Sequence, residues 1–451
     1  MANNNADTIY ALATPPGMSA VAIIRISGRK ALDVPALFDV KPAAARMARR
    51  AFLKDRDGNI LDDVMLLSFT GPASATGEDV LEIQCHGSAA VIDDILTTLS
   101  QHSGFRAAEP GEFTRRALDN GKMDITAAEG LADLIEAETS LQRRQATAQM
   151  AGQLSRPVGF WREKIARLLA HLEAMIDFAD EELPEALRRE IEQETAALCA
   201  ALEQALDDRN IGEIIRNGLS VVLAGPVNAG KSTLMNLLAG RKAAIVSDRA
   251  GTTRDVIEVK LSLAGIPIRL ADTAGLRETT DYIEAEGIKR AEDEIKEADL
   301  VVLVIDGSQP DWPDIARQMG EEISRPFLLI LSKADKGRIE HPDSSASEAI
   351  SVDLRDPKSI AGIEEALKQH LAPLNQASQT PIITRARHRQ AFSDALASLQ
   401  HSQTLSFEGD IALIAEEYRR AASALGRVTG HIDVEELLDH IFSRFCIGKY
   451  R

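Results

Sequence analysis

A glycine-rich segment at residues 225–232 constrains this chain more than any other stretch. It reads Gly-Pro-Val-Asn-Ala-Gly-Lys-Ser, between an apolar run at 219–224 and a segment with apolar residues at helical spacing. The strand, loop and helix context favours a phosphate-binding loop over a chance glycine-rich turn. Backbone N–H groups and the helix N-terminus would bind phosphate oxygens. Lys231 would reach the β- and γ-phosphates, and the Ser232 hydroxyl would bind Mg²⁺.

The surrounding region predicts a doubly wound α/β domain, because strand-like and helix-like segments alternate from residue 217 to residue 375. Such domains bind ligands at the carboxyl ends of their strands. The predicted strands are 219–224, 256–263, 266–271, 300–306, 327–332 and 349–352. The predicted helices are 231–239, 286–296, 314–322 and 360–370.

Three further motifs follow the loop in an order typical of a nucleotide switch protein. Gly-Thr-Thr-Arg-Asp at 251–255 offers a threonine that completes a Mg²⁺ shell and senses the γ-phosphate. Asp-Thr-Ala-Gly at 272–275 offers Asp272 for Mg²⁺ and a glycine N–H for the γ-phosphate. Ser-Lys-Ala-Asp at 332–335 ends in a carboxylate that accepts the paired N–H groups of guanine, so Asp335 would select GTP over ATP.

The position after the second motif is unusual for a GTP hydrolase. Leu276 stands where many small GTPases carry a water-positioning glutamine. Leucine cannot orient water, so the acidic stretch at 278–286 is the nearest source of a replacement. No arginine finger is evident, and a cation held beside the phosphates would supply a similar charge.

The first 120 residues predict a small α+β domain. Strand-like runs at 8–13, 20–26, 64–69 and 80–85 are separated by turn residues and one helix-like run at 89–99. Arg25 interrupts an apolar strand, and strand alternation puts Glu78 and Glu82 on one face and Asp79 on the other. Taken alone, each charge is expected to face water at a strand edge rather than to belong to a binding site.

Helical periodicity dominates both flanks of the α/β region. The predicted helices are 127–150, 158–179, 184–208, 386–405, 411–425 and 434–445, with Pro157 and Pro184 marking bends or breaks. We therefore expect residues 217–375 to be inserted into a discontinuous helical domain of residues 121–216 and 376–451, with hinges near Gly218 and Pro373.

Composition limits the classes of function. A net charge of −18 disfavours non-specific binding to nucleic acid or membranes, so any RNA contact would be local or made by a partner. The 3 scattered cysteines suggest reduced thiols. Neither a signal peptide nor a membrane span is evident in the sequence, which favours a cytoplasmic location.

Several motifs together resemble the MnmE family of bacterial tRNA-modification GTPases, also called TrmE. Besides the GTPase motifs, which mark only a large superfamily, the resemblance rests on the segments at 13–17, 25–28, 76–82, 110–113 and 445–449. It covers essentially the full length. It implies a folate-binding and dimerising N-terminal domain at 1–120, a helical domain, and an inserted G domain at 217–375.

The resemblance also implies a function. The family acts as a homodimer whose G domains pair when GTP and potassium bind. With an MnmG-type flavoprotein, in a heterotetramer, it adds a carboxymethylaminomethyl or aminomethyl group at C5 of the wobble uridine of certain tRNAs. A tetrahydrofolate derivative, 5,10-methylene or 5-formyl, supplies the one-carbon unit. A switch or assembly GTPase without modification chemistry is the alternative.

The resemblance assigns roles by position. Glu284 would position the attacking water, and Mg²⁺ would bind Ser232 and Thr253. Potassium would bind Asn228, Ser247, Arg249 and Thr252. The folate site would comprise Arg25, Glu82, Lys122 and Lys449, and Cys446 is either a reactive group or an ordinary buried thiol. The remaining GTP-binding positions would be Ala229, Gly230, Lys231, Thr233, Thr273, Ala274, Gly275 and Lys333.

The chain departs from the family pattern at several positions. Ser332 replaces an asparagine whose amide would brace the base and the phosphate loop, which predicts about fivefold weaker guanine binding. Val352 stands where alanine usually contacts the base, and Val227 stands where proline usually precedes the asparagine. Two residues, Tyr450 and Arg451, follow the usually terminal Lys449.

Overall fold

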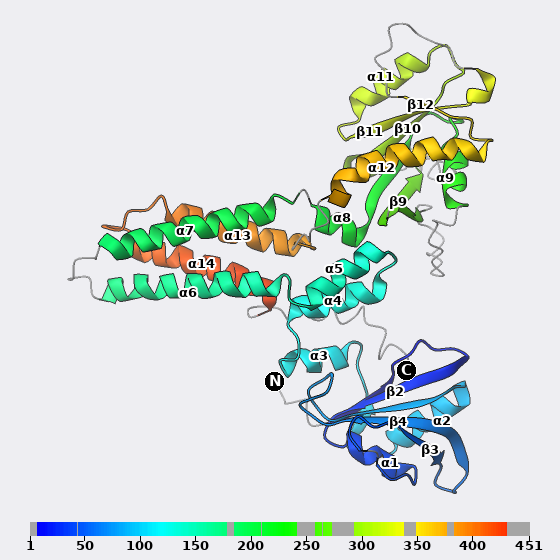
Figure 1. Ribbon diagram of the computed structural model, residues 1–451, viewed down its shortest axis with the longest axis vertical. Helices are drawn as coiled ribbons and strands as arrows, with labels where there is room; N and C mark the ends of the chain where they lie inside the picture. Colours follow the sequence, from blue (N-terminus) through cyan, green and yellow to red (C-terminus); the bar gives the residue numbers. More distant parts are fainter. Residues whose placement is uncertain are drawn as a thin grey trace, which may run out of the picture. The chain divides into compact units, whose positions relative to one another are not determined.

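The computed structural model describes residues 7–42, 44–177, 185–208, 210–240, 258–263, 265–272, 293–337, 349–376 and 383–430 (Figure 1). The chain divides into two compact units. The first unit draws on residues 1–135, 149–199 and 391–451, and the second on residues 136–148 and 200–390.

A six-stranded sheet forms the N-terminal part of the first unit. Its strands are β1 (Thr8–Leu12), β2 (Ser19–Ser27), β3 (Arg49–Lys54), β4 (Ile60–Phe69), β5 (Val80–Gly87) and β6 (Phe105–Ala107). The order is β3-β4-β5-β2-β1-β6, antiparallel except for the β1–β6 pair. Helices α1 (Val34–Leu37) and α2 (Ala89–Ser100) contribute to a core with Ile24, Leu66 and Ile83. The α+β prediction is therefore confirmed.

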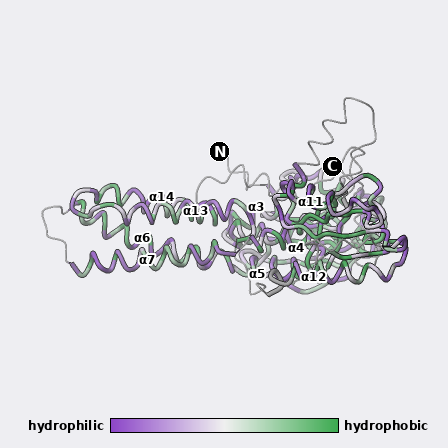
Figure 2. Tube along the Cα trace, turned by 90° about the horizontal axis from the view of Figure 1, so that it is seen from above, coloured by the Kyte–Doolittle hydropathy of each residue, from purple (hydrophilic) through white to green (hydrophobic). Residues whose placement is uncertain are grey.

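The helical part of the first unit is built from amphipathic helices. It contains α3 (Glu112–Asp119), α4 (Ile125–Glu136), the end of α5 (Ser140–Met150), α6 (Ser155–Asp177), most of α7 (Glu185–Leu206), most of α13 (Ala386–Ser402) and α14 (Ile411–Thr429). Hydrophilic and hydrophobic residues alternate along α6, α7, α13 and α14 (Figure 2). The apolar stripes meet in contacts such as the edge-on pair of Trp161 and Phe392.

Several of the expected helix boundaries are wrong, and two of the differences have a clear local cause. The expected helix at 127–150 divides into α4 and α5, because a reciprocal cap starts a new helix. Gln142 N lies 3.2 Å from Thr139 Oγ1, and Thr139 N lies 3.1 Å from Gln142 Oε1, which is the geometry of a capping box. Pro157 lies in the first turn of α6, where proline favours a helix start.

The second unit contains a second six-stranded sheet. Its strands are β7 (Leu219–Ala224), β8 (Glu258–Leu263), β9 (Ile266–Asp272), β10 (Leu300–Asp306), β11 (Phe327–Ser332) and β12 (Ile350–Ser351). The order is β12-β11-β10-β7-β9-β8, and all pairs are parallel except β8–β9. The main helices are α8 (Ile211–Asn217), α9 (Lys231–Ala239), α11 (Trp312–Glu322) and α12 (Ile360–Gln376).

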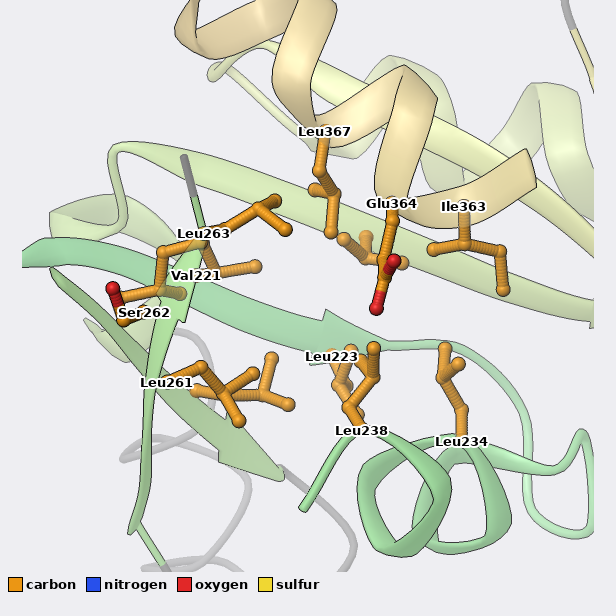
Figure 3. Close-up of a pocket in the computed structure, with 13 residues that line it drawn as sticks. Val221, Leu223, Leu234, Leu238, Leu261, Ser262, Leu263, Ile363, Glu364 and Leu367 are labelled. Carbon is orange, nitrogen blue, oxygen red and sulfur yellow. The ribbon is translucent and has the colours of Figure 1, made fainter. Parts of the chain in front are cut away.

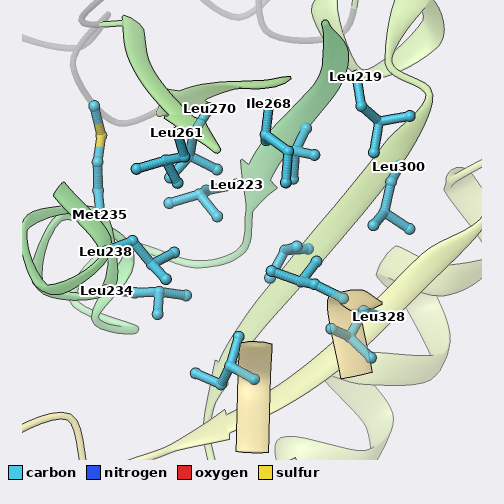
Figure 4. Packing of buried hydrophobic residues seen from close by; sticks show 14 of the residues in the cluster. Leu219, Leu223, Leu234, Met235, Leu238, Leu261, Ile268, Leu270, Leu300 and Leu328 are labelled. Carbon is cyan, nitrogen blue, oxygen red and sulfur yellow. The ribbon is translucent and has the colours of Figure 1, made fainter. Parts of the chain in front are cut away.

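Both faces of this sheet are buried, which explains the continuous apolar run of β10. Leu300, Val302 and Val304 join one core together with residues of α9 and α12 (Figure 4). Val301, Leu303 and Ile305 join the opposite core with Trp312 of α11. Parallel strands covered by helices on both faces are apolar throughout. The doubly wound prediction is therefore confirmed.

The α9–α12 face also contains an apolar pocket (Figure 3). Leu234 and Leu238 of α9 lie on one side of it, and Ile363, Glu364 and Leu367 of α12 lie on the other.

The expected hinges differ from one another in structure. Gly218 follows α8 with a φ of +84°, a conformation that favours glycine, so the chain can turn sharply into β7 there. Pro373 instead lies inside α12, which continues to Gln376. The predicted helix at 434–445 lies outside the described residues.

Cys85 and Cys199 are unbridged and buried, and burial raises the pKa of the Cys85 thiol to about 11. Among the helices that the structure describes, none is long and apolar enough to cross a membrane.

Candidate functional site

The phosphate loop depends on two glycines for its path. Gly225 has a φ of +138°, and a Cβ added there would lie 2.0 Å from the carbonyl oxygen of Val304 in β10. Gly230 precedes α9 with a φ of +103°, and an added Cβ would lie 2.9 Å from Leu354. A side chain at Gly225 would clash with the β10 backbone, and both glycines have a positive φ that residues with side chains rarely adopt.

The N-terminal turn of α9 presents the groups that a phosphate needs. Lys231 is 6% exposed, and its ammonium donates hydrogen bonds to the carbonyls of Gly225 and Pro226, both at 2.8 Å. Ser232 and Thr233 lie exposed in the same turn, and Asn228 is exposed with a left-handed φ of +64°. This donor set fits a phosphate chain and a hydroxyl-bound cation.

Ser332 supports the phosphate loop from β11. Its buried hydroxyl lies 2.6 Å from the carbonyl oxygen of Ala229 and 3.2 Å from that of Ile305. The expectation that serine leaves the phosphate loop unbraced is therefore wrong. The hydroxyl reaches the loop because β11 lies next to β10 and ends beside the loop.

We expect Ser332→Ala to weaken GDP binding about fivefold, because the Ala229 carbonyl loses a donor and the loop loses a brace. Isothermal titration of GDP checks this result. Ser262→Ala in β8 serves as the control and should leave the affinity within twofold. An affinity for the Ser332→Ala variant equal to that of the wild type would contradict the bracing role.

Two ion pairs involve residues of the predicted base-binding motif at 332–335. The Lys333 ammonium lies 2.7 Å from Asp306, at the carboxyl end of β10. Burial raises the pKa of Asp306, but hydrogen bonds from Lys333 and Ser308 outweigh it and bring the pKa to about 2. Asp335 lies 3.0 Å from Arg355. Asp306 could have been found from its position at a strand end, whereas no sequence signal indicated Arg355.

Many predicted site residues lie outside the described part of the chain. They are Ser247, Arg249, Thr252, Thr253, Thr273, Ala274, Gly275, Glu284, Cys446 and Lys449. Asp272 ends β9, and its backbone is in register with Leu223 of β7, so it lies at the same sheet edge as the loop.

Arg25 and Glu82, the first two predicted folate residues, form an ion pair. They are register partners on β2 and β5, and Arg25 Nη2 lies 2.7 Å from Glu82 Oε1. The Arg25 guanidinium also lies 6.0 Å from the centre of the Phe113 ring. Lys122 donates a hydrogen bond to the Pro72 carbonyl at 2.7 Å. The two paired side chains are partly buried, so neither is a charge that simply faces water at a strand edge.

A buried charge network supports this region and was missed by the sequence analysis. Arg116 is 2% exposed, and its guanidinium lies 2.9 Å from both Glu78 and Glu112. Arg106 also pairs with Glu112 at 2.5 Å. The interpretation of Glu78 as a strand-edge charge is wrong, since β5 begins only at Val80 and Glu78 binds a buried arginine.

The fold and the nucleotide site define a class of protein. A glycine loop enters a helix at the carboxyl end of the parallel strand β7. Two places along the same sheet, β11 leads into a Lys-Ala-Asp segment that carries a guanine-type carboxylate. This is the arrangement of a P-loop GTPase.

Comparisons with known proteins identify the family. The model described as "GTP-binding protein TrmE N-terminus" matches residues 8–122, and the model of the MnmE helical domain matches residues 125–446. A "tRNA modification GTPase MnmE" from Parvibaculum lavamentivorans is 46% identical over 98% of this chain and 100% of that protein. One from Paramagnetospirillum magneticum is 44% identical with the same coverage. The chain therefore belongs to the MnmE family of tRNA modification GTPases.

Among solved structures, the chain is similar to Era bound to MgGDPNP and a segment of 16S ribosomal RNA. That similarity covers 33% of this chain and 55% of the Era chain, with 26% identity and a TM-score of 0.26.

Proposed function

We propose that this chain is a potassium-activated GTPase that modifies tRNA together with an MnmG-type flavoprotein. The product would be a carboxymethylaminomethyl or aminomethyl group at C5 of the wobble uridine, with the one-carbon unit from a tetrahydrofolate derivative. The observation that carries this proposal is that a chain of the MnmE family contains both a complete phosphate loop and the Arg25–Glu82 pair. We further propose a cytoplasmic location.

The proposed hydrolysis depends on charges held at the phosphate loop. Lys231 and the α9 N-terminus would bind the phosphates, with Mg²⁺ held by Ser232 and Thr253. Asn228 would hold potassium with Ser247, Arg249 and Thr252, and its exposed place in the loop supports this role. Bound potassium would supply positive charge beside the phosphates, where an arginine would otherwise act. Glu284 would orient water, since Leu276 cannot.

The proposed folate site uses Arg25, Glu82, Lys122 and Lys449. Glu82 has an exposed fraction of 14% and Arg25 of 28%, so both remain partly accessible while paired. The carboxylate can accept hydrogen bonds from ring N–H groups, and the cations can bind carboxylates of a folate. The domain assignment at 1–120, 121–216 with 376–451, and 217–375 belongs to this proposal.

The N-terminal sheet supports the proposed homodimer. Its side away from α1 and α2 carries the exposed apolar residues Val21, Phe52 and Met65. Exposed apolar side chains on this face, together with the Arg50–Asp63 pair, offer a mixed apolar and charged surface to a partner. A second copy of the chain is the partner that the family implies, and the flavoprotein would complete a heterotetramer.

The test is mass analysis of nucleosides from tRNA incubated with the full-length chain, its flavoprotein partner, GTP and the folate, each omitted in turn. We expect the modified wobble uridine only when all are present. Glu82→Gln should lower its yield at least tenfold, since a hydrogen bond to a charged group contributes about 1.5–3 kcal/mol. Asp39→Asn, which disturbs the exposed pair with Lys54, is the control.

Modification without this chain would contradict the proposal. GTP turnover with unmodified uridines in the complete mixture would favour a switch or assembly GTPase instead.

A further inference from the structure

An exposed arginine lies on the carboxylate that is proposed to bind guanine. Asp335 lies in a short 3-10 helix, Ala334–Lys336, that follows β11, and its side chain is 23% exposed. Arg355 Nη1 lies 3.0 Å from Asp335 Oδ2, and the Arg355 side chain is 78% exposed. The guanidinium therefore approaches this carboxylate from the solvent side.

The backbone holds the two partners close together. Ala334 N donates to the Val352 carbonyl at 3.1 Å, and Val352 N donates to the Leu331 carbonyl at 2.8 Å. Arg355 N donates to Asp353 at 2.9 Å, and Leu354 is buried against the phosphate loop at Gly230. The segment from Val352 to Arg355 is thus anchored along its backbone. Only the Arg355 side chain therefore needs to move for Asp335 to become accessible.

Guanine and a guanidinium offer a carboxylate the same chemistry. The Watson–Crick edge of guanine presents two adjacent N–H donors, and arginine presents a planar fork of N–H donors. The Asp335 oxygen that lies against Arg355 has one of its two lone pairs engaged and its charge partly neutralised, so it is a weaker partner for guanine than a free carboxylate oxygen. We propose that Arg355 competes with guanine for Asp335 and so weakens nucleotide binding in this chain. The proposal rests on the proposed role of Asp335 in guanine recognition.

The direction in which GDP affinity changes when Arg355 is removed separates competition from other roles of this arginine. An exposed ion pair stabilises weakly, so its removal should tighten GDP binding about two- to fivefold. Removing a cation near a bound diphosphate without such competition should weaken binding, because the attraction between opposite charges is lost. Loss of stacking between an arginine and the base would also weaken it.

The test measures GDP affinity of the full-length chain by titration calorimetry for four variants beside the wild type. These are Arg355→Ala, Asp335→Ala, the double variant, and Lys358→Ala. Lys358 lies three residues further along the chain, in the 3-10 helix Pro357–Ser359, and its removal changes the charge equally. ADP is titrated into the wild type and Asp335→Ala to test guanine selection separately.

Competition predicts tighter GDP binding for Arg355→Ala, equal or weaker binding for Lys358→Ala, and no gain from removing Arg355 in the Asp335→Ala background. Unchanged or weaker binding by Arg355→Ala would overturn the proposal, as would an equal gain in the double variant. If Asp335→Ala keeps its preference for GDP over ADP, the guanine role of Asp335 fails, and this proposal fails with it. Loss of that preference without a gain in Arg355→Ala overturns the competition alone.

Discussion

We expect the Lys231→Ala variant to hydrolyse GTP at least 100-fold more slowly than the wild type. The loss of one preorganised hydrogen-bond donor typically lowers turnover by about 10²–10³. The Lys231 ammonium is buried in the loop and already held by two carbonyls at 2.8 Å. Its charge therefore lies in place before phosphates bind, with little reorganisation. Release of inorganic phosphate under saturating GTP measures the effect.

A surface cation of the same unit provides the control for Lys231. Arg317 of α11 is 72% exposed and pairs with Asp314, so Arg317→Ala should keep turnover within twofold. Turnover by Lys231→Ala within tenfold of the wild type would show that this lysine does not serve the phosphates.

The second large effect concerns stability. Replacing Arg116 by methionine removes the guanidinium that lies 2.9 Å from both Glu78 and Glu112 and leaves Glu112 with Arg106 as its arginine partner, so the loss costs about 1.5–3 kcal/mol. We expect faster amide hydrogen exchange across α3 and β1, because Arg116 also donates to the Asp7 carbonyl beside β1. Arg50→Met, which removes an arginine that is 70% exposed, should change exchange little. Equal protection in both variants would refute the role of the network.

Acid should reduce the difference in stability between the wild type and Arg116→Met. Burial raises the pKa of Glu112, but hydrogen bonds from Arg106, the Glu109 backbone and Arg116 outweigh it and lower the pKa overall. A carboxyl with a lowered folded pKa stabilises the fold above its unfolded pKa, and this contribution is lost as pH falls through the folded pKa. The free energy of unfolding of the wild type should therefore fall toward that of Arg116→Met only at a pH below the ordinary pKa of glutamate. A difference that stays constant through that range would contradict this account.

The nucleotide fold could be predicted because its signals are local. The apolar run of β10, the glycines of the phosphate loop and the periodicity of α9 each depend on neighbouring residues, and each prediction is confirmed. The division of residues 127–150 was also encoded locally, in Thr139 and Gln142, but a continuous apolar pattern masked it.

The missed features depend on contacts between residues far apart in the sequence. The Ser332 hydroxyl meets Ala229 across 103 positions, and Arg116 meets Glu78 across 38. Spacing rules for helices and strands carry no information about such pairs. The family resemblance placed Arg25 and Glu82 in one site, but their ion pair was not predicted, because it follows from the register between β2 and β5.

The most direct test of the central claim compares GTP turnover by the full-length chain in potassium and in sodium at equal ionic strength. The wild type should turn over GTP at least tenfold faster in potassium, since an arginine supplying similar charge contributes about 10³–10⁵ in rate. Asn228→Ala should lose this difference. Equal wild-type rates in the two salts would contradict the claim that a cation held at the phosphate loop drives hydrolysis.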